Sequence, residues 1–313
     1  MEGDNGAATA IPVLPAAPIP IPPSNAGGSS SLLLQYAKEK YGLPLNAAGT
    51  ELELPDTVTT IVVDVGALDS DYLAAMERTH DTTTALFLWE PQPLAAAELQ
   101  KRVAANPEMA QRVFVIAAAM GDIEQASVTF HIASAPSCGS LLPEGPSNFW
   151  CTKTIGTIQV PLHTLGDFLQ LLPLTWPPQR RFVHLSIATQ GSGMLVVQGA
   201  RDQLSKVETL VMECQNVESP TDPRLHRIGA ATCPALKAFL CQPDQGRNFC
   251  DYTYRQQGPE DMQSKAFFAK PPNFGVDGLK DLFPSTPTLM NAYMNKWYHE
   301  KADNKPLSPP ELV

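Results

Sequence analysis

The sequence lacks features that would each point to a different class of protein. No apolar run approaches the ~20 residues that a helix needs to span a bilayer, so a membrane protein is not expected. Basic residues are scarce, with 22 Lys and Arg against 32 Asp and Glu and a net charge of -10. Because this charge would repel phosphate backbones over most of the surface, nucleic acid is not expected as a partner.

The cysteines also lack a recognisable pattern. The six of them do not show the paired short spacing of a zinc site. A chain of 313 residues is long enough to fold around a core without disulfide bonds. Reduced thiols are therefore predicted. The N-terminal region shows neither a secretory signal nor an Arg-rich transit peptide, so a cytoplasmic protein is expected.

Composition divides the chain into three regions. Residues 1–31 are dense in Pro, Ala, Gly and Ser, which favours a disordered arm. We interpret this arm as a tether, and a weak contact with a proline-binding groove of another protein is the alternative. Residues 32–270 are predicted to form the folded domain. Residues 271–313 are predicted to be an extension with a short docking helix, since Met290, Tyr293, Met294 and Trp297 fall on one helical face.

The folded domain alternates apolar runs with helical patterns, which predicts a mostly parallel α/β sheet with helices on both faces. Strands are expected at residues 61–65, 85–90, 113–116, 127–132, 182–187, 209–213, 249–254 and 265–269, and helices at 71–79, 93–105, 192–205 and 234–240. The last two strands fit an antiparallel edge, so the sheet would have about seven strands. Residues 134–157 are expected to form a long loop that could act as a lid.

One motif suggests a ligand site. The strand at residues 61–65 ends in the turn Asp64-Val65-Gly66-Ala67, and Glu90 lies 24 residues after Gly66, at the end of the next strand. An acid at such a place can accept both hydroxyls of a ribose. The turn lacks the full G-x-G-x-x-G of pyrophosphate-binding loops, which favours S-adenosylmethionine (SAM) over a nicotinamide cofactor. A buried strand with an unrelated surface acid is the alternative that these residues leave open.

The sequence resembles a known family over residues 58 to 217. The segments are VVDVGALDSDY, LFLWEPQP, VIAAAMGD, VPLHTLGDFL, HLSIATQGSGMLVVQGARDQL and LVMECQNV, in the order and spacing of the FkbM-type family of class I SAM-dependent methyltransferases. The resemblance implies a Rossmann-like class I methyltransferase sheet and SAM as the cofactor.

The resemblance also implies which residues bind SAM. The positions that match the family's cofactor contacts are Asp64, Gly66, Ala67, Glu90, Ala119, Met120 and Asp122. The first three would lie beside the methionine part of SAM, the fourth would hold the ribose, and the last three would line the adenine.

The sequence departs from the family pattern at the expected site. Ser70 replaces a second glycine, and its Cβ would narrow the approach to the ligand. Ser186, Ala188 and Gly193 stand where the family tends to have charged residues at and after the fourth strand, and Gly166 replaces an acid. Loss of a general base typically costs ~10²–10⁴-fold in rate, so the activity could be impaired.

The catalytic residues are therefore unknown. Candidates for a proton acceptor are Glu213, His163 and His184, and the structural alternatives are a hydrogen bond to a loop, a helix cap and a core histidine respectively. No metal site is expected, because the fourth-strand acid that might contribute to one is Ala188.

The prediction is a SAM-dependent methyltransferase that methylates a hydroxyl oxygen of a small molecule or glycan. The alternative is a catalytically impaired pseudo-methyltransferase that acts as a binding or scaffold module. A nicotinamide-dependent oxidoreductase is a third possibility, which the turn after Asp64 does not fit.

Overall fold

The computed structural model describes residues 31–146, 153–172, 182–217, 219, 221–243, 247–256 and 263–269, all within one compact unit. The predicted arm lies outside these residues except for Ser31, whose hydroxyl accepts a hydrogen bond from the backbone N–H of Leu34 and caps helix α1 (Leu32–Ala37). The predicted extension at 271–313, with its docking helix, also lies outside them.

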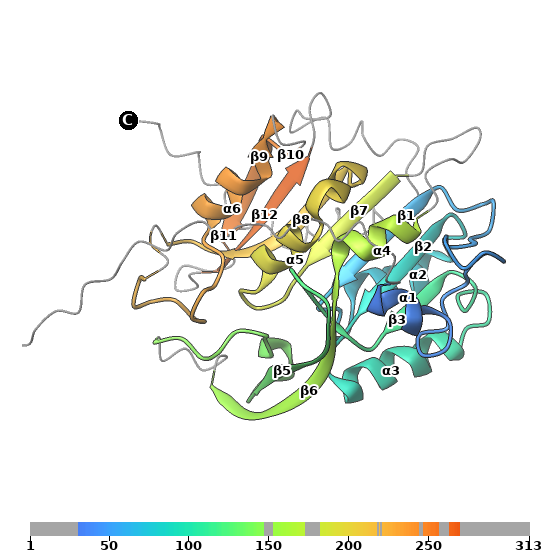
Figure 1. Cartoon of the computed structure of the whole chain (residues 1–313), viewed down its shortest axis with the longest axis horizontal. Helices are drawn as coiled ribbons and strands as arrows, with labels where there is room; N and C mark the ends of the chain where they lie inside the picture. The colour runs from blue at the N-terminus through green and yellow to red at the C-terminus, as the bar shows by residue number, and fades with distance from the viewer. Residues whose placement is uncertain are drawn as a thin grey trace, which may run out of the picture. The chain divides into compact units, whose positions relative to one another are not determined.

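A seven-stranded sheet forms the centre of the fold (Figure 1). Its order is β11-β12-β8-β7-β1-β2-β3. The strands are β1 (Thr60–Val65), β2 (Thr84–Trp89), β3 (Val113–Ile116), β7 (Phe182–Ile187), β8 (Thr209–Gln215), β11 (Asp251–Gln256) and β12 (Gln263–Ala269). Strands β3, β2, β1, β7 and β8 are parallel, whereas β12 runs antiparallel to both of its neighbours. This sheet confirms the predicted fold class.

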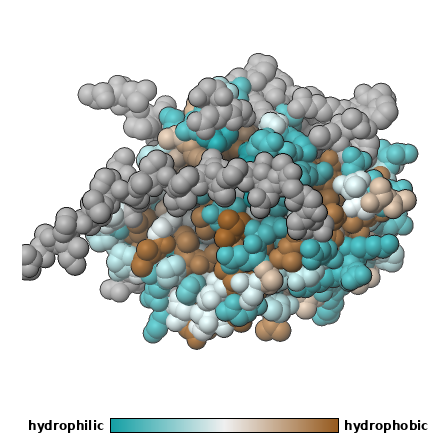
Figure 2. Space-filling view, viewed as in Figure 1, coloured by the Kyte–Doolittle hydropathy of each residue, from teal (hydrophilic) through white to brown (hydrophobic). Residues whose placement is uncertain are grey.

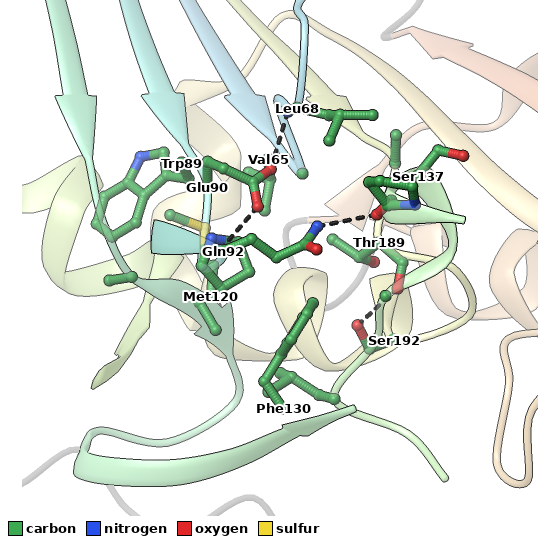
Figure 3. Close-up of a pocket in the computed structure, with 18 residues that line it drawn as sticks. Val65, Leu68, Trp89, Glu90, Gln92, Met120, Phe130, Ser137, Thr189 and Ser192 are labelled. Carbon is green, nitrogen blue, oxygen red and sulfur yellow. Dashed lines mark hydrogen bonds between the residues drawn. The ribbon is translucent and has the colours of Figure 1, made fainter. Parts of the chain in front are cut away.

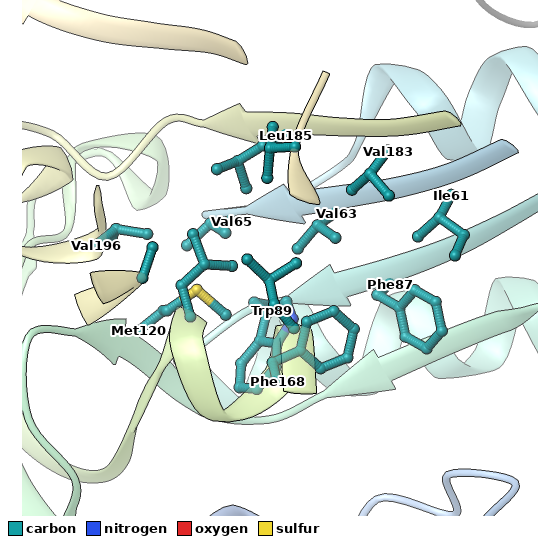
Figure 4. Close-up of a cluster of buried hydrophobic side chains, with 14 of the residues drawn as sticks. Ile61, Val63, Val65, Phe87, Trp89, Met120, Phe168, Val183, Leu185 and Val196 are labelled. Carbon is teal, nitrogen blue, oxygen red and sulfur yellow. The ribbon is translucent and has the colours of Figure 1, made fainter. Parts of the chain in front are cut away.

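Helices cover both faces of the sheet because the parallel strands are apolar on both sides. Val62 and Leu86 pack in one cluster with residues of α2 (Asp71–Thr79) and α3 (Pro93–Ala104). Ile61, Val63 and Val65 point to the other face, where they form one cluster with Phe168 of α4 (Leu165–Leu171) and Val196 of α5 (Gly193–Gly199) (Figure 4). Helix α6 (Cys233–Leu240) joins the same cluster. Each fully buried Val, Ile or Phe contributes about 1.5–3 kcal/mol, so these two layers fix the strands in place.

A second sheet lies beside the first one. It consists of β4 (Ala119–Gly121), β6 (Thr154–Thr164) and β5 (Gln125–Ala133), in that order. The strand expected at residues 127–132 thus belongs to this sheet. The loop expected at 134–157 is shorter, because residues 154–157 begin β6 and pair with β5. Within the loop, a 3₁₀ helix covers Pro136–Cys138. A two-stranded ribbon, β9 (Cys241–Gln242) and β10 (Arg247–Asn248), follows α6.

The helix expected at residues 192–205 is two elements. Helix α5 ends at Gly199, and a 3₁₀ helix, η3, covers Arg201–Lys206. A Cβ at Gly199 would lie 2.0 Å from the carbonyl oxygen of Gly121, so only glycine permits this contact. Arg201 then takes a φ of 53°, which interrupts the helical backbone.

The prediction of reduced cysteines is wrong. Cys214 of β8 is bonded to Cys233 of α6, Cys241 is bonded to Cys250, and Cys138 is also disulfide-bonded. The pairs form because the fold brings β8 and α6 together, with 5.1 Å between the Cα atoms of Cys214 and Cys233, and sequence spacing does not reveal this. The cytoplasmic location expected from the N-terminal region is not favoured by these disulfides, which are rare in the cytosol.

The surface of the described part is mixed in polarity. In Figure 2, hydrophobic residues are interspersed with hydrophilic ones on the face shown. The large apolar side chains that are exposed come from four separate segments: Leu94, Ile123, Ile155 and Ile228. No helix of the described residues is long and apolar enough to cross a membrane.

Candidate functional site

A cleft lies at the carboxyl ends of β1, β2 and β7, where an open α/β sheet places its ligands (Figure 3). Its walls come from the loops after these strands, from the segment around β4, from β5 and from the 3₁₀ helix at Pro136–Cys138. The lining residues are Val65, Gly66, Leu68, Trp89, Glu90, Pro91, Gln92, Ala118, Ala119, Met120, Phe130, Pro136, Ser137, Gly139, Leu141, Ala188, Thr189 and Ser192. Of the described residues on its wall, Glu90 alone is ionisable.

Glu90 directly follows β2, and its side chain is 1% exposed. One carboxylate oxygen accepts the backbone N–H of Leu68 and the other accepts that of Gln92, each at 2.8 Å. Burial raises the pKa of the Glu90 carboxyl, and these two N–H donors oppose the rise. Because each carboxylate oxygen can accept a further hydrogen bond, the group can still bind two hydroxyls of a ligand.

The turn after β1 brings the backbone close to β7. Gly66 has a φ of 82°, and a Cβ there would lie 2.2 Å from the carbonyl oxygen of Ala188. Glycine is therefore required for both reasons. Leu68, with a φ of 41°, continues the turn and directs its N–H to Glu90. The turn thus closes the bottom of the cleft and orients the carboxylate.

Asp64 and Ser70 hold this turn from behind. The Ser70 hydroxyl donates to the Asp64 carboxylate at 2.7 Å and accepts the N–H of Leu73 at 3.3 Å, so it caps α2. Neither residue is part of the cleft wall. The expectation that the Ser70 Cβ narrows the approach to the ligand therefore finds no support in this geometry. The side chain of Ser70 has a different cost, because the backbone φ of 33° is strained for any residue other than glycine.

The other predicted cofactor residues divide into two groups. Ala119 and Met120 lie on the cleft wall with Gly66 and Glu90, so four of the predicted positions meet at one place. Asp64, Ala67 and Asp122 are not on the wall. Ala67 instead packs in the apolar cluster under α2 and α3.

The loop after β7 forms the opposite end of the cleft from β4. Ser140 and Ser192 both donate to the carbonyl oxygen of Thr189, at 3.3 Å and 3.1 Å. The Ser140 hydroxyl also donates to the carbonyl oxygen of Gln190 at 3.1 Å. The hydroxyl oxygen of Thr189 itself is buried and has no hydrogen-bond partner among the described residues.

None of the three candidates for proton acceptor lies on the cleft wall. His184 is a fully buried core residue whose ring nitrogens pair with Tyr72 and Thr209, and burial lowers its pKa to about 3. His163 is likewise buried, between the Tyr41 hydroxyl at 2.9 Å and the Glu124 carboxylate at 3.4 Å. Glu213 accepts a hydrogen bond from the side chain of Gln190 at 3.2 Å.

Gln92 is a site residue that the sequence analysis did not single out. Its backbone N–H binds Glu90, and its side chain extends across the cleft, where the amide nitrogen donates to the carbonyl oxygen of Pro136 at 2.9 Å (Figure 3). The remaining free space is about 40 Å³, enough for a few water molecules at roughly 10–15 Å³ each. A nucleoside could enter only if a wall or the Gln92 side chain moved.

The described part of the chain contains no group of three or more His, Cys, Asp or Glu side chains placed to hold a metal ion. The residues on the wall offer apolar contacts, hydroxyls and one carboxylate. These groups suit an uncharged or cationic organic ligand with hydroxyls.

The sequence matches no protein-family model and no curated protein. The fold is similar to that of the methyltransferase FkbM from Methylobacillus flagellatus KT, with 15% identity, a TM-score of 0.41, and coverage of 68% of this chain and 44% of that one. The apo SAM-dependent methyltransferase SibL has 14% identity, a TM-score of 0.32, and coverage of 69% and 52%. The CMeT domain of the citrinin polyketide synthase has 8% identity, a TM-score of 0.32, and coverage of 70% and 49%.

The chain thus spans about half the length of these solved structures. These likenesses describe the fold alone.

Proposed function

We propose that the chain binds SAM in this cleft and transfers its methyl group to a hydroxyl oxygen of a small molecule or glycan. The observation that carries the proposal is Glu90, a buried carboxylate at the carboxyl end of β2. Both of its oxygens can accept a ribose hydroxyl in addition to the backbone N–H that each already holds. Its negative charge also complements the cationic sulfonium of SAM.

The rest of the wall fits the cofactor in kind. Ala118–Met120 and Phe130 give the cleft an apolar end that suits an adenine ring. Gly66 lets the turn pass close to the backbone of Ala188, and both residues lie on the cleft wall. For the whole of SAM to enter, a wall or the Gln92 side chain has to move, because the cavity volume is only about 40 Å³.

Bound SAM would supply a methyl group on a sulfonium: the acceptor oxygen would bond to the methyl carbon as the methyl–sulfur bond breaks, with S-adenosylhomocysteine as the leaving group and the hydroxyl proton lost to solvent. The protein's own contribution would be to align the nucleophile with that methyl group and to exclude water, and alignment supplies much of the rate of such a displacement. Among the described residues of the wall, only Glu90 could take a proton, and the ribose would occupy it. Transfer to an unactivated alcohol is therefore expected to lack the ~10²–10⁴-fold contribution of a general base.

This observation favours a second candidate function, a SAM-binding module that does not transfer the methyl group. Such a module would need Glu90 and Gly66 but no base in the acceptor part of the cleft. The two candidates predict the same cofactor binding and differ only in turnover.

The first experiment is isothermal titration calorimetry of the purified full chain with SAM. We expect binding that Glu90→Ala weakens at least tenfold, which corresponds to about 1.4 kcal/mol. Glu98→Ala is the matched control, because Glu98 lies on α3 with a side chain that is 61% exposed and pairs only with Lys101 at 3.5 Å. The absence of SAM binding to folded wild-type protein would refute both candidate functions.

The second experiment separates the two candidates. Release of S-adenosylhomocysteine (SAH) is measured with SAM and a panel of phenols, alcohols and oligosaccharides. Release that depends on one acceptor and disappears in Glu90→Ala supports methyl transfer. Tight SAM binding without release for any acceptor class supports the binding module.

A further inference from the structure

The buried hydroxyl of Thr189 has no hydrogen-bond partner among the described residues. Burial of an unpaired hydroxyl costs about 1–3 kcal/mol, so such a group calls for an explanation. Thr189 lies on the cleft wall, and its side chain is seen beside the cleft in Figure 3. The missing partner is therefore to be sought in a ligand of this cleft.

The backbone of Thr189 is held in place by two other hydroxyls. Ser140 and Ser192 donate to its carbonyl oxygen from opposite segments, one after β5 and one at the start of α5. The hydroxyls of Ser140 and Ser192 thus hold the backbone of Thr189 in place. The Thr189 hydroxyl makes no such bond itself to any of the described residues. A group whose supports are locked in this way is preorganised for binding.

The sheet register gives the separation between the ends of β2 and β7, the strands that precede Glu90 and Thr189. Val65 of β1 pairs with Trp89 of β2 and with Ile187 of β7, so Gly66, Glu90 and Ala188 follow three neighbouring strands at one level. Neighbouring strands lie about 4.8 Å apart, which places the ends of β2 and β7 roughly 10 Å apart. This separation is comparable to the span of extended SAM from its ribose hydroxyls to its amino-acid group.

We propose that the Thr189 hydroxyl forms a hydrogen bond with the amino-acid group of SAM. The proposal rests on the proposed function. With the ribose at Glu90 and the adenine against the apolar Ala118–Met120 segment, the amino-acid group extends toward the end of β7. A hydroxyl both donates and accepts, so it can pair with the carboxylate or the ammonium of that group.

The test compares two ligands that differ in this group. SAH carries the amino-acid group, whereas 5′-methylthioadenosine has the same adenine and ribose and lacks it. Binding of each ligand to the full chain is measured by calorimetry for the wild type, Thr189→Val and Thr189→Ser. Valine keeps the shape of threonine and removes the hydroxyl, and serine keeps the hydroxyl.

We expect Thr189→Val to weaken SAH binding about tenfold, as the loss of a hydrogen bond to a charged group implies. Its affinity for 5′-methylthioadenosine should stay within twofold of the wild type, and Thr189→Ser should restore most of the affinity for SAH. Ser205→Ala is the control for the removal of a hydroxyl, because Ser205 is exposed, is not on the cleft wall and donates to the carbonyl oxygen of Asp202 in its own 3₁₀ helix.

Two results would overturn the proposal. An unchanged affinity of Thr189→Val for SAH would show that the hydroxyl does not touch the ligand. An equal loss for both ligands would show that it acts on the nucleoside or on the fold. If folded wild-type protein binds neither ligand, the proposed function itself fails, so the two failures can be told apart.

Discussion

Ser70 allows the strain in the turn after β1 to be measured separately from its hydrogen bonds. Replacement by alanine removes the cap of α2, worth about 1 kcal/mol, and the hydrogen bond to the buried Asp64 carboxylate, worth about 1.5–3 kcal/mol. Asp64 keeps another interaction, so its charge is not left isolated. We expect Ser70→Ala to lower the free energy of unfolding by about 3 kcal/mol.

Replacement by glycine removes the same bonds and also relieves the φ of 33°, a backbone conformation that costs an L residue about 1–3 kcal/mol. Part of this gain is offset by the greater freedom of glycine in the unfolded chain, about 0.5–1 kcal/mol. Ser70→Gly should therefore be about 1 kcal/mol more stable than Ser70→Ala, although it is the smaller residue. The measurement is urea unfolding followed by far-UV circular dichroism at pH 7.

A glycine variant as unstable as the alanine variant would refute the assignment of strain to residue 70. An alanine variant within about 0.5 kcal/mol of the wild type would refute the importance of the bond to Asp64. Ser205→Ala serves as the control, since it removes an exposed hydroxyl that donates to the carbonyl oxygen of Asp202.

Further predictions concern the core, the disulfides and the cleft. His184 has a pKa of about 3 in the folded protein and of 6.5 in the unfolded chain. Its contribution to the free energy of unfolding is therefore fully present above pH 6.5 and is lost on acidification, by about 2 kcal/mol at pH 5. Urea unfolding above pH 6.5 and at pH 5 measures this loss. The free energy of unfolding of His184→Gln should fall less between the two pH values than that of the wild type, and an equal fall would contradict a neutral core histidine. Replacement of Cys214 and Cys233 by serine should lower the free energy of unfolding by about 3 kcal/mol, as expected for a bond that spans 19 residues. Addition of a reductant should then lower the free energy of unfolding of this variant less than that of the wild type. Gln92→Ala removes the contact with Pro136 across the cleft and should tighten SAM binding about fivefold in calorimetry, whereas weaker binding would make Gln92 a ligand contact.

The sequence predicted the parallel core of the fold well because its signals there are strong and local. The β-branched run of β1 and the apolar run of β2 are buried at every position, and the boundaries expected for them differ from the structure by one residue. The helix expected at residues 71–79 is α2, with the same bounds. The strand β6 escaped prediction because its first half is largely exposed and lacks a regular apolar alternation.

The site was predicted in part for a similar reason. Gly66 and Glu90 can be found from the sequence, because a turn and an acid after consecutive strands of a parallel sheet must lie side by side. Gln92 and Thr189 have no such signal. The Gln92 side chain donates to a carbonyl group 44 residues away. Thr189 stands out only because its buried hydroxyl has no hydrogen-bond partner among the described residues. Disulfide pairing is likewise a property of the packed fold.

Trp89 gives the cleft an internal optical reporter. Its indole ring is fully buried in the core beside Phe168 (Figure 4), its Nε1 has no hydrogen-bond partner among the described residues, and Trp89 lies on the cleft wall directly before Glu90. An indole in such apolar surroundings emits at short wavelength, and a ligand that enters beside it changes its emission. With Trp150, Trp176 and Trp297 replaced by phenylalanine, the remaining fluorescence would follow events in the cleft in real time, without a label on the protein or the ligand.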